Sequence, residues 1–269
     1  MSSAASPRAR APAVAGMFYP AEPDVLRHDV EAYLAAVPEH GRLRNAPKAI
    51  VVPHAGFVYS APVAAAAYAR LRDAAGVTRV VLLGPSHRVG FRGLAVPTVD
   101  AFAMPLGPIP IDRDGREMLL RERRAIAADQ PHEFEHSLEV QLPFLQSVLG
   151  AFSLLPIVVG DATRQEVAAA LETVWGGDET LIVVSTDLSH YHRYEHAVRV
   201  DAETRRAILA LDPRLEPDDA CGCIGVNALL IAAAHRGLVA RELAACNSGD
   251  TAGDRARVVG YAAFGFYAR

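Results

Sequence analysis

Cysteine is scarce in this sequence, with three residues among 269. Their number and uneven spacing exclude a disulfide-stabilised fold, and we expect the reducing interior of the cytoplasm. No apolar run approaches the roughly 20 residues needed to cross a bilayer. The first 16 residues are small and polar and lack the apolar stretch of a secretory signal. We expect residues 1–11 to form a disordered tail before a single domain over residues 12–269.

An excess of charge of either sign is also missing. The chain has 27 basic and 31 acidic residues, a formal net charge of −4. It therefore has no global positive field to attract nucleic acid or a membrane surface. The motifs Gly-x-Ser-x-Gly, Gly-x-Gly-x-x-Gly, Cys-x-x-Cys and His-Glu-x-x-His are absent, as is a Walker loop. Their absence weakens hydrolase-triad, nucleotide-binding and local zinc-motif interpretations.

Short β-branched runs alternate with helical patterns along the chain. Half of the residues are hydrophobic (51%), and several runs are continuously apolar, which is typical of strands buried on both faces. The predicted strands are 49–53, 79–83, 94–97, 154–159, 180–185, 241–246 and 257–264. The alternation predicts an α/β fold with a mostly parallel or mixed central sheet between helix layers.

Four helices are predicted between these strands. The first covers residues 24–37, and the second follows Ser60 with Pro62 in its first turn. Thr163 and Glu166 form a Thr-x-x-Glu capping box before a helix over residues 167–175. The fourth begins near residue 218 and ends near Gly237.

Histidines follow three of the predicted strands in equivalent positions. His54 follows the first of them, His87 the second, and Asp187 and His190 follow the strand over residues 180–185. The carboxyl ends of parallel strands lie at one edge of a sheet, where ligands bind in open α/β folds. We therefore expect these side chains to converge, for metal ligation or for proton transfer. A single histidine of this kind is more often an ordinary hydrogen-bonded loop residue.

The motifs that contain these residues resemble the MEMO family, called AmmeMemoRadiSam system protein B in bacteria. The resemblance covers residues from about Pro12 to the C-terminus. Its blocks, in chain order, are Val14-Ala15-Gly16-Met17-Phe18-Tyr19-Pro20, Pro53-His54-Ala55-Gly56, Gly84-Pro85-Ser86-His87, Glu135-His136-Ser137-Leu138-Glu139-Val140-Gln141-Leu142-Pro143, Ser185-Thr186-Asp187-Leu188-Ser189-His190 and Gly260-Tyr261-Ala262-Ala263-Phe264-Gly265.

The resemblance implies a fold like that of the LigB-type, class III extradiol dioxygenases and one mononuclear metal. It implies that His54, His87 and Cys246 are the metal ligands, with Asp187 and His190 in the same pocket. The dioxygenases hold Fe(II) with two histidines and a carboxylate. A thiolate in place of the carboxylate keeps Fe(II) the favoured metal but makes the site tolerate copper or zinc. Without the resemblance, Cys246 reads as an ordinary buried thiol.

Three further residues are candidates for supporting roles near the metal. His136 and Glu139 stand at the amino end of an apolar helical stripe, where they either cap a solvated helix end or orient a ligand and receive substrate. Cys221 is expected to pack near the site, and Cys223 is expected in the core. We expect His190 to transfer protons, oriented by Asp187.

The sequence supports three hypotheses for function. The first is a non-haem, metal-dependent oxidoreductase acting on a small or peptide-borne substrate, with AMMECR1-like and radical SAM proteins as pathway partners implied by the family's name. The second is a binding or adaptor module that holds a peptide or sequesters metal without turnover. The third is a zinc hydrolase, with His190 activating a metal-bound water. Turnover separates the first from the second, and the metal's identity separates the first from the third.

Overall fold

The structure is a computed structural model that describes residues 8–38, 46–72, 74 and 76–269. The central feature is a mixed sheet in the order β10-β12-β2-β9-β3-β8-β4-β7, with β11 paired to β12, and a small sheet β1-β5-β6 lies beside it. The strands are β1 (Ala9–Arg10), β2 (Ala49–Val52), β3 (Arg79–Pro85), β4 (Leu94–Val96), β5 (Ala101–Phe102), β6 (Ile109–Pro110), β7 (Ile126–Ala127), β8 (Ser153–Val159), β9 (Thr180–Ser185), β10 (His190–His192), β11 (Val239–Asn247) and β12 (Val258–Tyr267).

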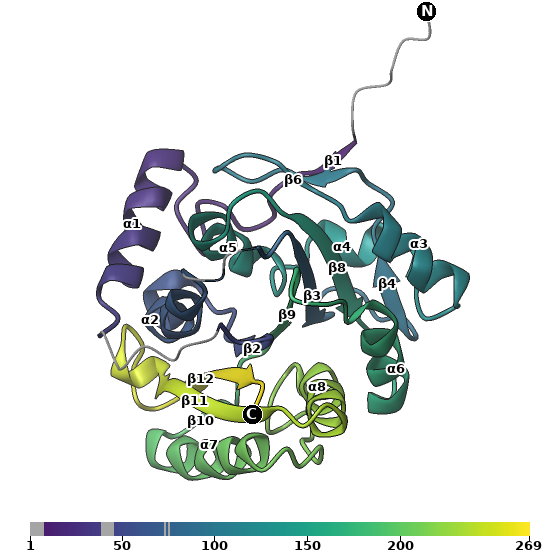
Figure 1. Cartoon of the computed structure of the whole chain (residues 1–269). Helices are drawn as coiled ribbons and strands as arrows, with labels where there is room; N and C mark the ends of the chain where they lie inside the picture. Colours follow the sequence, from purple (N-terminus) through teal and green to yellow (C-terminus); the bar gives the residue numbers. More distant parts are fainter. Residues whose placement is uncertain (1–7, 39–45, 73, 75) are drawn as a thin grey trace, which may run out of the picture.

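Helices cover both faces of the central sheet (Figure 1). They are α1 (Pro23–Ala35), α2 (Phe57–Tyr68), α3 (Arg113–Arg121), α4 (Gln130–Glu133), α5 (Leu142–Val148), α6 (Arg164–Val174), α7 (Tyr194–Leu209) and α8 (Cys223–His235), with the 3-10 turns η1 (Ala69–Leu71), η2 (Glu139–Gln141) and η3 (Ser248–Asp250). One face packs on α1, α2 and α5, and the other packs on α6, α8 and parts of α3 and α7. The predicted α/β fold with helix layers on a mixed sheet is confirmed.

The strand residues alternate between the two cores. In β3, Val80 and Leu82 face the layer of α1 and α2, whereas Val81 and Leu83 face the layer of α6 and α8. All four are fully buried, because successive side chains of a strand point to opposite faces. A continuously apolar run is therefore what a strand covered on both sides requires.

Strands β2, β9, β3 and β8 are mutually parallel, so their carboxyl ends share one edge. Neighbouring strands β3 and β9 send the chain in opposite directions from that edge. From β3 the chain runs to β4 on the far side of β8, and from β9 it runs to β10 on the far side of β2. Such a divergence opens a crevice, the usual ligand position in an open α/β sheet.

Two expected helix starts differ from the structure, and one long helix was not expected. Helix α2 begins at Phe57, three residues before the expected Ser60, so Pro62 lies inside the helix and not in its first turn. Helix α8 begins at Cys223 and not near residue 218, because residues 217–219 form a turn before it. Helix α7 was not predicted. Its exposed face is strongly charged, and only a few of its residues are buried.

The expected disordered tail over residues 1–11 is wrong for residues 9–10, which are ordered. Residues 1–7 lie outside the described residues. Ala9 and Arg10 form strand β1, which pairs with β5, and the Arg10 side chain is 7% exposed. This segment is fixed because Arg10 Nη1 lies 2.5 Å from Glu139 Oε2 and Arg10 Nε donates to the His132 carbonyl.

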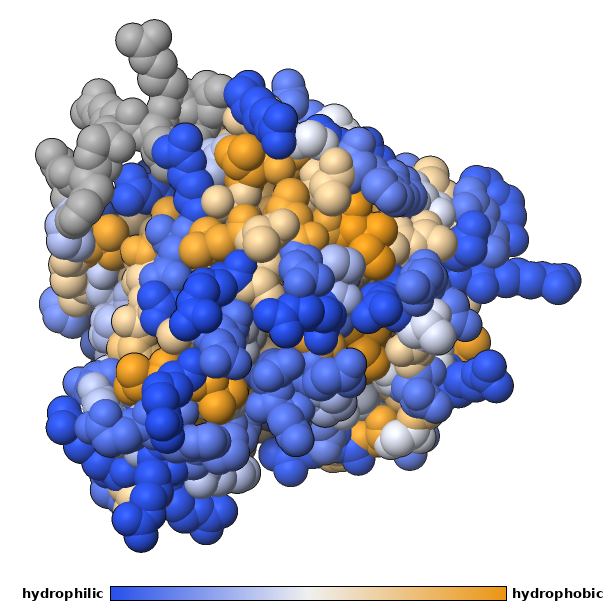
Figure 2. Space-filling view, turned by 90° about the horizontal axis from the view of Figure 1, so that it is seen from below, coloured by the Kyte–Doolittle hydropathy of each residue, from blue (hydrophilic) through white to orange (hydrophobic). Residues whose placement is uncertain are grey.

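The surface on the α7 side of the molecule mixes hydrophilic and hydrophobic groups (Figure 2). Hydrophilic side chains dominate this face, and apolar ones gather in smaller areas between them. In the described part of the chain, no helix is long and apolar enough to span a bilayer.

Candidate metal centre

Three histidines converge at the sheet edge in the described residues. His54 follows β2, His87 follows β3, and His136 lies between α4 and η2. One ring nitrogen of each lies within 4.8 Å of those of the other two. The ring centroids are separated by 5.1 Å for His54 and His87, 5.4 Å for His54 and His136, and 4.6 Å for His87 and His136.

The hydrogen bonds of Ser185 fix which nitrogen of His54 carries the proton. Ser185 Oγ donates to the Ser137 carbonyl at 2.6 Å and accepts from Gln141 Nε2 at 2.8 Å. Since its only proton is used, Ser185 Oγ must also accept from His54 Nδ1, at 2.8 Å. His54 Nε2 is therefore unprotonated and can accept a hydrogen bond from the Cys221 thiol, whose Sγ lies 3.4 Å away.

The carboxylate of Glu135 orients His87 in the same way. Glu135 Oε1 accepts from His87 Nδ1 at 2.9 Å, and Oε2 accepts from the His87 backbone N–H at 2.6 Å. Burial opposes the charge of Glu135, but hydrogen bonds from His87 and Ser137 outweigh it and lower the pKa of Glu135 to about 2. A carboxylate that binds Nδ1–H leaves Nε2 of a neutral imidazole as the ligand atom, as in many metal sites.

The third histidine has a buried nitrogen without a hydrogen bond. His136 Nδ1 makes none with any described residue, although it lies 3.4 Å from Glu135 Oε1. Burial lowers the pKa of His136 to about 4, so the ring is neutral at physiological pH. The Phe18 ring packs against it edge to face, with centroids 5.0 Å apart. An orphaned buried nitrogen is costly, and a metal ligand bond would satisfy it.

The cluster suits a metal ion chemically. Burial, with the neighbouring His87 and His136, lowers the pKa of His54 well below its usual value, so His54 also stays neutral. Neutral imidazole is the ligating form. Nitrogens about 2.1 Å from one ion in a tetrahedral site lie about 3.4 Å apart, so ligand atoms within 4.8 Å of one another would have to approach by at most about 1.4 Å. The residues present therefore fit one ion held by His54, His87 and His136.

The structure does not bring Cys246, expected as the third ligand, to these histidines. Cys246 lies in β11 opposite Tyr261 and lines a separate cavity of about 190 Å³ with Asp201 and Arg205 of α7. Cys246 instead lines the side of β11 on which α7 packs. The third position of the cluster belongs to His136, whose sequence context left it as a capping or supporting residue.

Cys221 is the thiol beside the cluster. Its Sγ lies 3.4 Å from His54 Nε2 and accepts from the Asp187 backbone N–H at 3.3 Å. Burial, and then the nearby Asp187, raise the pKa of Cys221 to about 12, so without a metal the sulfur stays protonated. Cys223, two residues further, is buried in the core beneath α8, as expected.

Asp187 and His190 both line the pocket of the histidines, a cavity of about 1060 Å³. They do not form the expected pair: Asp187 Oδ1 accepts from the His54 backbone N–H at 2.8 Å, and no hydrogen bond joins Asp187 to His190 among the described residues. Burial raises the pKa of Asp187 to about 7 despite its backbone hydrogen bonds. Burial lowers the pKa of His190, against a hydrogen bond to the Leu188 backbone.

Glu139 makes no hydrogen bond to the three histidines in the described part of the chain. It supports the site by holding the N-terminal segment in place. Its buried carboxylate accepts from the backbone N–H groups of Ala13 and Val14 and from the hydroxyl of Tyr19, and it pairs with Arg10. These bonds fix the segment that places Phe18 on His136. The first block of the family resemblance, residues 14–20, therefore forms one wall of the site.

Exposed apolar side chains surround the mouth of the histidine pocket. Met17 is 71% exposed, Tyr191 63%, Val58 58% and Tyr59 36%, and all four line this pocket. Tyr191 has a positive φ of 62°, a conformation that side-chain-bearing residues rarely adopt and that concentrates at functional sites. Ser185 and Gln141, which support His54, were not predicted from the sequence. Both lie within the blocks that resemble the MEMO family, and this was the only sequence feature that could have identified them.

Comparisons with known proteins identify the family of the chain. A profile of the family described as "Memo-like protein" matches residues 10–265. A MEMO1 family protein of Thermotoga sp. strain RQ2 is 36% identical over 273 residues, which cover 94% of this chain and 97% of that protein. MEMO1 family proteins of Aquifex aeolicus and Methanopyrus kandleri are each 35% identical, with 94% and 96% of this chain covered and 97% and 98% of theirs. The chain therefore belongs to the Memo-like protein family.

Proposed function

We propose that this Memo-family protein binds one metal ion through His54, His87 and His136 and uses it in a redox reaction on a small or peptide-borne substrate. The observation that carries the proposal is the cluster itself: three imidazoles with ring nitrogens within 4.8 Å of one another, one of which has no hydrogen-bond partner for its buried Nδ1 among the described residues. Iron(II) is the favoured metal, because the resemblance to the MEMO family implies a fold like that of the LigB-type dioxygenases, which hold Fe(II).

The metal would supply redox chemistry and open positions for small molecules. The chain's own residues do the rest. Ser185 and Glu135 keep the Nδ1 protons of His54 and His87 in place, so that both rings present Nε2 without reorganisation. Asp187, whose pKa is raised to about 7 by burial, can hold or release a proton near neutral pH. His190 lies in the same pocket, and we assign it the proton-transfer role.

A zinc hydrolase is the second candidate, and the ligand set favours it specifically. Three histidines form a typical catalytic zinc site, whereas the extradiol dioxygenases include a carboxylate among their ligands. The absence of a carboxylate from the three clustered residues also argues against ring cleavage of simple catechols. Elemental composition and redox activity separate the two candidates.

The experiment is anaerobic purification of the chain, elemental analysis, and nitric oxide titration followed by electron paramagnetic resonance. An iron(II) centre with an open position is expected to give a high-spin iron–nitrosyl signal. The hydrolase would be favoured if the purified protein contains one equivalent of zinc and the iron-loaded protein gives no nitrosyl signal. If the protein binds metal stoichiometrically but turns over no oxidisable substrate, the binding-module hypothesis would be favoured.

Single substitutions test the ligand assignment. His54→Ala, His87→Ala and His136→Ala are each expected to weaken metal binding by well over tenfold, because each removes one of three donors. Cys246→Ser is the matched test of the ligand that the sequence resemblance implied, and it should retain wild-type metal content. Metal lost from the Cys246→Ser protein but kept by the His136→Ala protein would refute the three-histidine site.

The cellular context belongs to the same proposal. We place the protein in the cytoplasm, in a pathway with AMMECR1-like and radical SAM proteins, on the strength of the family's name and the scarce cysteines. Fractionation of cells and co-purification with a tagged chain test it. Recovery of the chain only from a membrane or secreted fraction would contradict it.

A further inference from the structure

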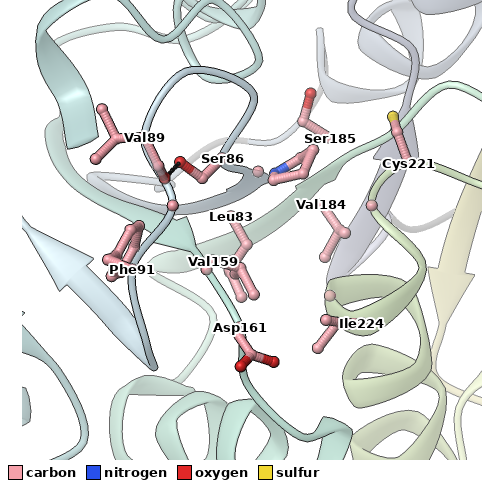
Figure 3. Close-up of a pocket in the computed structure, with 16 residues that line it drawn as sticks. Leu83, Ser86, Val89, Phe91, Val159, Asp161, Val184, Ser185, Cys221 and Ile224 are labelled. Atoms are coloured by element: carbon pink, nitrogen blue, oxygen red, sulfur yellow. Dashed lines mark hydrogen bonds between the residues drawn. The ribbon is translucent and has the colours of Figure 1, made fainter. Parts of the chain in front are cut away.

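A second cavity lies at the same sheet edge, on the side of α8 (Figure 3). It has a volume of about 230 Å³ and is bounded by the ends of β3, β8 and β9, the loop after β3 and the first turn of α8. We call it the sheet-edge pocket. It occupies the crevice between the diverging strands β3 and β9, where open α/β sheets bind ligands. Cys221 lines both this pocket and the histidine pocket, so the thiol stands between the two.

The walls of the sheet-edge pocket are mainly apolar. Leu83, Val184 and Ile224 point into it from the sheet and from α8, and Phe91 lies on the side of the loop after β3 (Figure 3). Leu83 and Val184 are almost fully buried. An aliphatic and aromatic lining of this size suits a small ring or alkyl group, and burial of such a group is favourable by about 25 cal/mol per Å².

The polar side chains that line the pocket are hydrogen-bonded within the chain, with one exception. Ser86 Oγ donates to the Val89 carbonyl at 2.7 Å, and Ser185 Oγ is fully used in the network around His54. Cys221 Sγ accepts from the Asp187 backbone N–H. At the start of α8, the Gly222 N–H donates to Thr186 Oγ1 and the Cys223 N–H to the Ala220 carbonyl.

The exception is Asp161, the one charged side chain among the residues that line this pocket. Its carboxylate makes no hydrogen bond or ion pair with the described part of the chain, and it is exposed. In Figure 3 it lies at the end of the pocket away from Cys221. No basic side chain lines the pocket, so its electrostatics favour a positive group near Asp161 and disfavour an anion.

We infer that the sheet-edge pocket is a binding site for a small amine with an apolar body. The ring or alkyl part lies among Leu83, Phe91 and Ile224, and the ammonium group pairs with Asp161 at the open end. The inference goes beyond the proposed metal chemistry and does not depend on it, because none of the three histidines lines this pocket.

The test uses 2-phenylethylamine as the probe and 3-phenylpropionate as the matched anion, titrated into the full chain by isothermal calorimetry with and without metal. Saturable one-site binding of the amine is expected, with weaker or no binding of the acid. Asp161→Asn should weaken amine binding about two- to fivefold, the value of an exposed ion pair. Glu117→Gln, the same charge change at an exposed position of α3 that lines neither pocket, should leave binding unchanged.

Blocking variants locate the site. Ile224→Trp fills the sheet-edge pocket from a half-buried position in the first turn of α8 and should abolish amine binding. Ile224→Ala is the second variant at this position, and it should weaken amine binding because it removes part of the apolar lining. Val58→Trp alters the mouth of the histidine pocket and should change nothing. No saturable binding by the wild type, equal or tighter binding of the acid, or loss only in Val58→Trp would each overturn the inference.

Discussion

Two histidines of the candidate site, His54 and His87, are each oriented by one neighbouring side chain. Ser185 has a single proton, which it gives to the Ser137 carbonyl, so it can only accept from His54 Nδ1. Glu135 can only accept from His87. Two residues that would contact no metal therefore decide which ring nitrogens are free.

Replacing Ser185 should weaken metal binding without removing a ligand. In a Ser185→Ala protein, His54 Nδ1 loses its acceptor and the ring is no longer held in one tautomer. We expect a loss of about 10- to 100-fold in metal affinity, the usual effect of such supporting groups, measured by competition with a chelator. Ser147→Ala is the control, because its hydroxyl bonds only within α5. Unchanged affinity in the Ser185→Ala protein would show that Ser185 does not position His54.

His132 makes the fold sensitive to acid. Burial, assisted by Arg10, lowers the pKa of His132 to about 3 in the folded chain, against about 6.5 in an unfolded chain. Above pH 6.5 His132 is neutral in both the folded and the unfolded chain, so it does not change the free energy of unfolding. As the pH falls from 6.5 toward 3, the unfolded state gains the proton first, so stability is lost, on the order of 4 kcal/mol by pH 3.5.

The measurement is the free energy of unfolding in urea between pH 7 and pH 3.5. A His132→Gln protein keeps a donor for the Ala95 carbonyl, which His132 Nε2 contacts at 3.1 Å, and should lose less stability over this range than the wild type. His235→Gln, at an exposed position, should behave as the wild type. Parallel curves for wild type and His132→Gln would contradict the assignment.

At the scale of elements, the N-terminal segment is held to the body by one buried ion pair. Arg10 and Glu139 side chains are 6% and 0% exposed. Glu139→Gln would leave the Arg10 charge buried without a counter-charge, at a cost of about 3–5 kcal/mol, seen as a lower urea midpoint. It should also expose strand β1 to proteolysis. Glu133→Gln, an exposed neighbour in α4, is the control. If the free energy of unfolding falls by less than about 1 kcal/mol, the range of surface ion pairs, the Arg10–Glu139 pair does not hold the N-terminal segment.

At the scale of the whole molecule, metal binding should be visible as thermal stability. A metal at 100 times its Kd stabilises the folded state by about 2.7 kcal/mol, which raises Tm by about 5–10 °C in a chain of this size. The rise should vanish in the His136→Ala protein and persist in Cys246→Ser. A chelator should reverse it. An equal rise in the His136→Ala protein would mean that the metal binds elsewhere.

The elements were largely predictable from the sequence because their signals are local. Strand β9 was predicted with its observed bounds, since an apolar run between polar residues needs no partner to be recognised. The Thr163–Glu166 capping box forms as predicted, because both of its hydrogen bonds lie within four residues. Helix α7 escaped detection because its buried stripe is narrow and its packing surface comes from β11 and β12.

The family, the α/β alternation and the placement of His54 and His87 at strand ends could all be predicted from the sequence, because blocks of adjacent residues encode each of these. The third histidine of the cluster emerged only from the folded chain. His136 stands in a connecting segment, and its approach to His54 and His87 depends on the Glu135 hydrogen bonds and on the Phe18 contact across 118 residues (136 − 18). Likewise, Cys221 rather than Cys246 adjoins His54 because α8 begins at the sheet edge, whereas α7 packs against β11. Distances between remote segments follow from packing, which no local pattern specifies.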